Sequence, residues 1–278
     1  MNVRAPHVLS RALLYAAVVV VVGTLFFPVY WMFNTSLAPQ DQLYVYPPKF
    51  IHPNATFAAY AKIFRERPIA RWLANSFVVV VLTCGFSLAI SVLAGYSLSR
   101  FRVRGAGGLG YLMLASRMLP TTLLVIPLFV FMSSLKLIDS LWSVVIANVT
   151  FILPFATWML KGYFDSIPRE LEEAAYIDGT SRLGALIRVT LPLAAPGVAA
   201  TMLYSAILAW DEYLFARTFL NTTSAWTITV GLGSFRGEYI TFWNEVMAAS
   251  LVGTLPIIVI FLLLEKQLVG GLTAGAVK

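Results

Sequence analysis

A few charged and aromatic side chains interrupt long apolar runs, and these are the residues that could do chemistry. Arg117 lies inside one apolar run, and Trp210, Asp211, Glu212 and Tyr213 interrupt another. Charged residues within an apolar span are costly and usually face protein or water, so they mark candidate pathways for solutes or ions. Aromatic faces with carboxylates commonly hold sugars, whereas acidic and basic groups in a span can relay ions or protons.

Each of these positions also has a structural interpretation. Arg117 can be an anchor near the membrane interface, and Asp211 and Glu212 can be interfacial residues where their span ends. Adjacent helix positions point about 100° apart, which argues against one site shared by both carboxylates. We therefore treat Arg117 and residues 210–213 as candidates for the substrate path.

Patterns for catalysis, metals and nucleotides are weak or missing in the sequence. The chain has one cysteine, Cys84, and two histidines, His7 and His52, which gives little support for a clustered metal site. A G-x-G-x-x-G pattern occurs at residues 105–110, but it follows no expected strand and opens an apolar run. No glycine–lysine phosphate-binding motif occurs. We expect no catalytic residue, metal or cofactor on this chain, and therefore no enzyme activity of its own.

The composition is typical of an integral membrane protein. Hydrophobic residues make up 59% of the 278 residues, charged residues only 12%, and the mean hydropathy is +0.80. These values exclude an ordinary soluble domain. The formal net charge of +7 does not require a nucleic-acid partner, because Lys and Arg in membrane proteins serve topology and contacts with lipid headgroups.

The apolar runs predict an all-α membrane protein with six transmembrane helices and both termini in the cytoplasm. Each run is long enough, or nearly so, to cross a bilayer. Arg100, Arg102 and Arg104 follow the second run without an acidic residue, the clearest sign of a cytoplasmic loop. The first run is too long for the core of a signal peptide. The runs cover about residues 12–33, 71–100, 110–135, 141–160, 194–210 and 246–264.

Residues 34–71, between the first two runs, form an expected external segment. Pro47, Pro48 and Pro53 exclude one continuous helix there. A short amphipathic helix on the membrane surface is indicated by Phe57, Tyr60, Ala61 and Phe64.

Residues 167–192, between the fourth and fifth runs, form a long polar segment with helical character. Pro168 suits a first helical turn, where its missing N–H is not needed. Asp178 and Gly179 form a stop signal, because glycine adopts the left-handed cap conformation at little steric cost. The helix dipole favours negative charge in the first turn, where three glutamates stand: Glu170, Glu172 and Glu173.

A second short helix is expected after this stop. Thr180 or Ser181 can cap it, and the spacing of Leu183, Leu186 and Ile187 places them on one face. The segment therefore predicts a helix–turn–helix at the membrane surface. On spacing alone, an ordinary amphipathic connector remains the alternative.

The same segment resembles the EAA loop of ABC-importer permeases. Glu173-Ala174-Ala175, then Gly179, then the sequence Val-Thr-Leu-Pro at 189–192 follow that pattern, with Val189 where isoleucine is usual. In that family the loop is a coupling helix, which docks in a groove of a cytoplasmic ATPase and carries its motion into the membrane. The resemblance assigns ATPase coupling to Glu170, Glu172, Glu173, Ala174, Ala175, Asp178 and Gly179.

Further segments resemble MalG-type permease subunits of carbohydrate ABC importers. They are residues 71–76, the Trp210 region with Asp211 where asparagine is commoner, and the tail at 270–278. The resemblance implies the type I importer permease fold. It divides the chain into a first helix and external segment (1–70), a transmembrane domain (71–265) with a coupling loop (163–193), and a cytoplasmic tail (266–278).

The resemblance also implies function and partners. It implies import of a sugar or sugar-derived solute across a prokaryotic cytoplasmic membrane by alternating access. The implied partners are a second, MalF-like permease, two copies of a cytoplasmic ABC ATPase that carries ATP and Mg, an extracytoplasmic solute-binding protein and membrane lipid, without nucleic acid. An ion- or proton-coupled secondary transporter using Arg117, Asp211 and Glu212 remains the competing class, with a different energy source.

Overall fold

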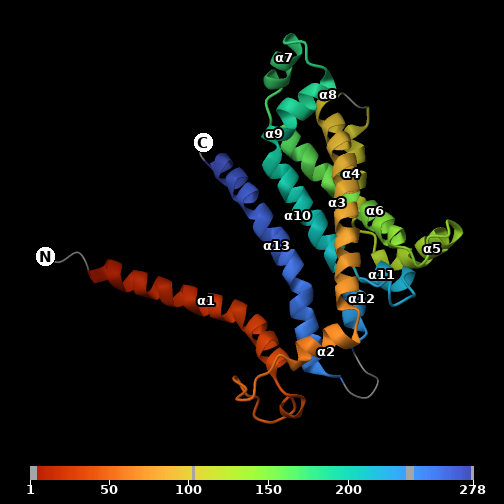
Figure 1. Cartoon of the computed structure of the whole chain (residues 1–278). Helices are drawn as coiled ribbons and strands as arrows, with labels where there is room; N and C mark the ends of the chain where they lie inside the picture. Colours follow the sequence, from red (N-terminus) through yellow and green to blue (C-terminus); the bar gives the residue numbers. More distant parts are fainter. Residues whose placement is uncertain (1–4, 102–103, 236–240, 277–278) are drawn as a thin grey trace. The chain divides into compact units, whose positions relative to one another are not determined.

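The computed structural model describes residues 5–101, 104–235 and 241–276, and every regular element within these ranges is helical (Figure 1). The all-α prediction is therefore confirmed. Internal contacts divide the chain into two units. Unit 1 is Met1–Ile69 with Ser234–Val252, and unit 2 is Ala70–Gly233 with Gly253–Lys278.

Unit 1 holds the first long helix and the segment that follows it. It contains α1 (Ala5–Leu37), the short 3-10 helix η1 (Gln40–Gln42), α2 (Ala58–Glu66) and the first turns of α13 (Trp243–Ala276). The Asn244 side chain donates to the Ala38 carbonyl at 3.2 Å, and Lys62 Nζ lies 2.6 Å from Glu245 Oε1. These contacts fix the start of α13 to the segment after α1.

The helix α2 forms where the sequence predicts one, and its position on the membrane surface stays a prediction. Ala59 and Ile63 are buried, whereas Phe57 and Phe64 are exposed. Residues one helical turn apart share a face, and Lys62 beside this pair reaches Glu245 of α13. Ala59 and Ile63 therefore pack against the protein, while Phe57 and Phe64 point outward.

Unit 2 holds the remaining helices, and in Figure 1 α7 and α8 lie at one of its ends and α11 and α12 at the other. The long helix α3 runs between these ends. The elements are α3 (Ile69–Arg100), α4 (Ala106–Ser116), α5 (Thr121–Ser134), α6 (Leu141–Asp165), α7 (Glu170–Ile177), α8 (Arg182–Ala185), the π-helical turn η2 (Leu186–Thr190), α9 (Leu191–Leu193), α10 (Ala195–Asp211), α11 (Leu214–Phe219) and α12 (Ile228–Gly233). The remainder of α13 completes the unit.

The main apolar core of unit 2 joins α3, α5, α6 and α11. Val79, Met132 and Phe219 are buried in it. Phe151 of α6 stacks on Phe215 of α11, with 5.2 Å between the ring centroids. This core holds the α11 segment, which follows Glu212, against the centre of α6.

Four helical stretches of the described residues are long and apolar enough to cross a membrane, or up to six if each of two bent pairs is one span. The four are Leu13–Leu37, Ile69–Arg100, Leu141–Asp165 and Trp243–Glu265. The bent pairs are Gly107–Ser116 with Thr121–Ser134, at 92°, and Arg182–Leu193 with Ala195–Asp211, at 80°. The six-span fold class agrees with this set, while the side of the membrane on which each terminus lies stays a prediction.

The third expected span differs from a continuous helix, whereas the fifth agrees with one. The third run, 110–135, is broken between Ser116 and Thr121, because Pro120 cannot continue the helix and adopts an extended ψ of 120°. The fifth run begins as a helix at Ala195 and ends at Asp211. Asp211 is therefore the last residue of its helix, and its position relative to the membrane interface stays a prediction.

The last helix continues beyond the expected end of the transmembrane domain. α13 extends through Ala276 without a break at residue 265. Residues 277–278 lie outside the described ranges. The sequence boundary at 265/266 therefore falls within a helix, and the cytoplasmic position of the tail stays a prediction.

Candidate functional site

The coupling loop folds as the predicted helix–turn–helix. α7 begins at Glu170, with Glu170, Glu172 and Glu173 in its first turn, and it ends at Ile177. Gly179 has a φ of +81°, the left-handed conformation expected of the stop signal. Ser181, not Thr180, caps α8, because its hydroxyl accepts from the Gly184 N–H at 3.2 Å.

Pro168 and the leucine face of α8 differ from their predictions. Pro168 lies before the helix, whose N-cap residue is Arg169. Leu186 is buried, whereas Leu183 and Ile187 are exposed. The turn after α8 widens into the π-helical stretch Leu186–Thr190, so the ideal spacing that places the three on one face does not hold.

The carboxylate of Glu172 is the buried centre of the loop. Arg100 Nε lies 2.8 Å from its Oε1, and the side chains of the two residues are only 7% and 4% exposed. The Thr190 hydroxyl donates to Oε1 at 2.7 Å, and the Tyr96 hydroxyl donates to Oε2 at 2.9 Å. One carboxylate therefore ties α7 to the end of α3 and to the turn after α8.

Neighbouring polar contacts continue this attachment. Arg100 also donates to the Ile167 carbonyl at 3.1 Å, and Arg169 donates to the Ser99 carbonyl at 2.8 Å. The Ser99 hydroxyl donates to Asp165 at 2.6 Å. Both ends of the segment that leads into α7 are thereby held to the last turn of α3.

The environment of Glu172 favours its ionised form. Burial alone would raise the pKa of this carboxyl group, but hydrogen bonds from Thr190, Arg100 and Tyr96, with the charge of Arg100, lower the pKa below its ordinary value. Several hydrogen bonds to a carboxylate offset the free-energy cost of burying its charge. Glu172 is therefore a charged anchor within the fold.

The other predicted coupling residues form the outer side of the loop. Ala175 is half-buried, whereas the rest of the set is exposed: Glu170, Glu173, Ala174, Asp178 and Gly179. Ile177, at the end of α7, is 88% exposed. An exposed acidic helix with small alanines and one projecting isoleucine can be approached closely by a second protein.

The four residues of the Trp210 element have different surroundings. Trp210 is buried and donates from its indole N–H to the Gly253 carbonyl at 3.2 Å. Glu212 caps α11, because its two carboxylate oxygens accept from the N–H groups of Phe215 at 2.6 Å and Ala216 at 2.9 Å. Asp211 and Tyr213 are exposed. Trp210 and Glu212 therefore make contacts that hold the fold, whereas Asp211 and Tyr213 are accessible.

Arg117 lies at the break between α4 and α5. Its guanidinium donates to the Phe151 carbonyl at 3.2 Å and lies 5.6 Å from the ring centroids of Phe155 and Tyr204. It lines a cavity of about 440 Å³ with residues of α5 and α6. None of residues 210–213 lines this cavity.

Sequence reasoning missed the inward partners of Glu172. Tyr96 belongs to an apolar run and Thr190 to the Val-Thr-Leu-Pro sequence, and neither carries a local sign of contact with Glu172. The sequence indicates Arg100 only as a marker of membrane topology. The one available signal was a basic residue at the end of a span, which needs a counterion if it is buried.

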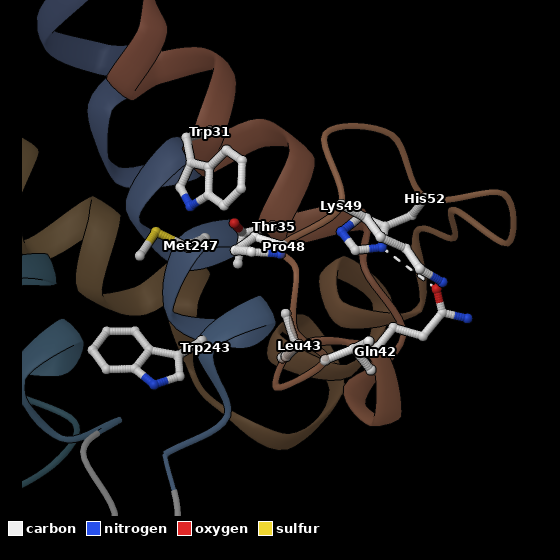
Figure 2. Close-up of a pocket in the computed structure, with 10 residues that line it drawn as sticks. Trp31, Thr35, Gln42, Leu43, Pro48, Lys49, His52, Trp243 and Met247 are labelled. Carbon is white, nitrogen blue, oxygen red and sulfur yellow. Dashed lines mark hydrogen bonds between the residues drawn. The ribbon is translucent and has the colours of Figure 1, made fainter.

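A further cavity of about 290 Å³ lies within unit 1. Figure 2 shows Trp31 and Trp243 on its two sides, with His52 at its edge. His52 pairs with Gln42 at 3.5 Å between Nδ1 and Oε1. Burial and, secondarily, the charge of Lys49 lower the pKa of His52, so its imidazole is predominantly neutral at pH 7. No sequence pattern indicates that these residues meet.

The fold and the loop together define a helical membrane protein of several candidate spans with an exposed acidic loop. Residues 58–269 match the family described as binding-protein-dependent transport system inner membrane component. The chain belongs to this family and is an ABC importer permease, a transport subunit rather than an enzyme.

Curated relatives are similar along nearly their whole length. The sulfoquinovosyl glycerol transport system permease protein SmoH of Agrobacterium fabrum is 36% identical over 263 residues, which cover 95% of this chain and 92% of that protein. The trehalose/maltose transport system permease protein MalG of Thermococcus litoralis is 34% identical over 275 residues, 98% of each chain. The diacetylchitobiose uptake system permease protein DasC of Streptomyces coelicolor is 33% identical over 262 residues, 94% of this chain and 95% of that protein.

Two solved structures share the fold. A chain of a bacterial ABC transporter involved in the import of the acidic polysaccharide alginate has a TM-score of 0.80 at 23% identity, with 96% of this chain and 98% of that chain covered. A chain of a bacterial alginate ABC transporter in complex with a pentasaccharide-bound periplasmic protein has a TM-score of 0.67 at 16% identity, with 94% and 96% covered. The importer permease fold therefore extends over nearly the whole chain.

Proposed function

We propose that this permease carries a sugar or a sugar-derived solute across the cytoplasmic membrane of a prokaryote. Support comes from the similar relatives, whose names specify sulfoquinovosyl glycerol, trehalose or maltose, and diacetylchitobiose as transported solutes. The exposed aromatic and acidic residues Tyr213 and Asp211 suit contact with a sugar near the path.

We further propose that α7 transmits ATPase motion into the membrane. The observation that carries this proposal is the attachment of α7 to α3 through the buried Glu172–Arg100 pair. A force applied to the exposed side of α7 then reaches a span directly, because the connection is made by charge-assisted hydrogen bonds. Glu173, Ala174 and Gly179 would meet the ATPase, whereas Glu172 would hold the loop.

The proposed assembly contains this chain, a second MalF-like permease, two copies of a cytoplasmic ABC ATPase and an extracytoplasmic binding protein. ATP and Mg would bind to the ATPase and no cofactor to this chain. Closure of the ATPase dimer would shift the spans between inward-facing and outward-facing states, through differential affinity for those states. The binding protein would deliver the solute to the outward-facing state.

The test is uptake and ATP hydrolysis by the complete transporter in proteoliposomes. Glu173→Lys and Gly179→Val should abolish both activities without loss of membrane insertion, since one reverses an exposed charge and the other places a branched side chain at a φ of +81°. Glu66→Lys reverses another exposed glutamate, on α2 of unit 1, and should transport normally. Normal transport by both loop variants would refute the coupling role.

The same vesicles separate this mechanism from an ion-coupled one. Uptake should require ATP inside the compartment that holds the ATPase and should survive an ionophore. Uptake that is independent of ATP but abolished by the ionophore would favour a secondary transporter that uses Arg117, Asp211 and Glu212.

A further inference from the structure

The cavity beside Arg117 has the features of a ligand site within unit 2. Its volume of about 440 Å³ falls in the range of roughly 300–1,000 Å³ typical of small-molecule pockets. The lining is mainly apolar, with polar side chains from Ser116, Arg117 and Thr150. A few polar groups among apolar walls are what such pockets use to orient a ligand.

The charge of Arg117 is not balanced by an acidic neighbour. No carboxylate in the described part of the chain is paired with it by an ion pair, although the residue stands at the break of a candidate span. A charged group at membrane depth normally faces an opposite charge or water. The guanidinium carries several N–H donors, and the Phe151 carbonyl accepts from Nη1.

The surrounding rings and backbone restrict what this cation can bind. Phe155 and Tyr204 lie with their ring centroids 5.6 Å from the guanidinium carbon, a distance suited to cation–π contact. The planar guanidinium group has a fork of donors that suits bidentate binding of a planar carboxylate. Pro154 has no N–H to donate to the Thr150 carbonyl one helical turn earlier, so this carbonyl can accept from a ligand hydroxyl.

We propose that the Arg117 cavity binds an acidic sugar, with the sugar carboxylate on the Arg117 guanidinium and the ring against the apolar wall of α5 and α6. This inference rests on the proposed sugar-import function and narrows its substrate class to sugars that carry an anionic group. Thr150 supplies polar contact for a hydroxyl of the same ligand. A lipid headgroup and a carboxylate of the second permease are the other occupants, and the test distinguishes them.

The test measures equilibrium binding of glucuronate and glucose to the complete permease–ATPase complex without binding protein. These probes differ only in a carboxylate against a hydroxymethyl group. Nanodiscs of phosphatidylcholine alone remove competition by anionic lipid. The wild type should bind glucuronate roughly tenfold to a hundredfold more tightly than glucose, as expected for a charge-assisted hydrogen bond.

The variants assign this preference to one side chain. Arg117→Met should lose the preference, and Arg117→Lys should keep only part of it, since an ammonium cannot form the planar fork. The matched control is Arg217→Met, which removes another exposed arginine that lies 5.9 Å over a ring, that of Trp226. It should keep the full preference. Size-exclusion profiles establish that each complex is assembled.

Several results would overturn the inference. They are equal binding of the two sugars, no binding of either, or an unchanged preference in Arg117→Met. Release of phosphatidylglycerol from native-lipid complexes by Arg117→Met alone, without a glucuronate preference in the wild type, would assign the cavity to a lipid. Loss of the second permease from Arg117→Met complexes would assign Arg117 to a structural ion pair.

The outcome is separable from that of the proposed function. Uptake of neutral sugars alone, driven by ATP, would overturn the acidic-sugar inference and leave the importer function intact. Failure of ATP to drive uptake of any sugar would refute the importer function itself.

Discussion

The guanidinium of Arg100, at the last residue of α3, lies 2.8 Å from the carboxylate of Glu172 in the first turn of α7. Both side chains are buried. The contact joins the end of a candidate span to the helix that we propose docks on an ATPase. The two roles suggested by sequence, a topological arginine and a coupling glutamate, therefore meet in one ion pair.

Glu172→Ala should destabilise the protein by about 3–5 kcal/mol, because it leaves Arg100 buried without its partner. Glu172→Gln keeps one acceptor oxygen for Thr190 and Arg100 but removes the charge, and it should lose less stability. Thermal unfolding of the purified complex in nanodiscs measures both effects. The control is Glu170→Ala, in the same helical turn but exposed. Equal stability of all three variants would contradict the anchoring role of Glu172.

Acidification should weaken the same anchor. The folded-state pKa of Glu172 is lowered from the ordinary value of 4.5, so its stabilising contribution is complete above pH 4.5 and is lost as the pH falls through the lowered pKa. Thermal unfolding midpoints measured from pH 7 downward should fall more steeply for the wild type than for Glu172→Gln. Parallel curves for the two proteins would show that the carboxyl group is not linked to folding.

The local features of the coupling loop could be predicted from the sequence, and its inward contacts could not. Helix dipole, glycine cap and hydroxyl cap are short-range effects, and they correctly placed Gly179 and the alternative Ser181. The burial of Glu172 depends on Tyr96 and Thr190, which are distant from it along the chain. The periodic spacing of residues along a helix predicts only local contacts and cannot predict that these residues meet.

The spans show the same division. Apolar length alone located all the candidate spans, but the bends depend on backbone geometry at single residues. Pro120 lies within the third run, and the apolar pattern does not show the 92° bend between α4 and α5. Likewise, Asp211 and Glu212 are adjacent in sequence, yet only Glu212 turns back to cap α11.

Ile177→Asp should weaken association with the ATPase by at least about tenfold, because an 88% exposed isoleucine beside the acidic turn is suited to a partner pocket. Co-purification of the ATPase at graded salt and protein concentration measures the loss. Ile51→Asp changes another isoleucine, 79% exposed in unit 1, and should not affect association. Full ATPase retention by the Ile177 variant would place the docking contact elsewhere on the loop.

Asp211→Ala and Glu212→Ala should differ although the residues are adjacent. Glu212→Ala removes both acceptors at the start of α11 and should cost about 0.5–2 kcal/mol of stability, as helix-cap losses do. Asp211→Ala should leave stability unchanged and reduce sugar transport if Asp211 borders the path. Thermal unfolding and the Michaelis constant for uptake separate the two effects. Unchanged transport in Asp211→Ala and Tyr213→Ala would remove both from the proposed path.

Trp72 and Gly231 should be energetically coupled. A Cβ atom added at Gly231 would lie 2.1 Å from the indole ring of Trp72, and that indole donates to the Thr223 carbonyl at 2.8 Å. Gly231→Ala should therefore destabilise the protein by about 1–3 kcal/mol through overpacking. In Trp72→Phe the smaller ring leaves room, so Gly231→Ala should cost less there than in the wild type.

A double-mutant cycle on thermal or denaturant unfolding measures this coupling between Trp72 and Gly231. Gly85→Ala is the control substitution, since a Cβ at Gly85 meets no atom within 4 Å, and it should be tolerated in either background. If Gly231→Ala lowers stability equally in the wild type and in Trp72→Phe, the indole ring does not limit the room available at position 231. A smaller cost with Phe would establish that the entry of α3 and the α12 segment fold as one packed unit.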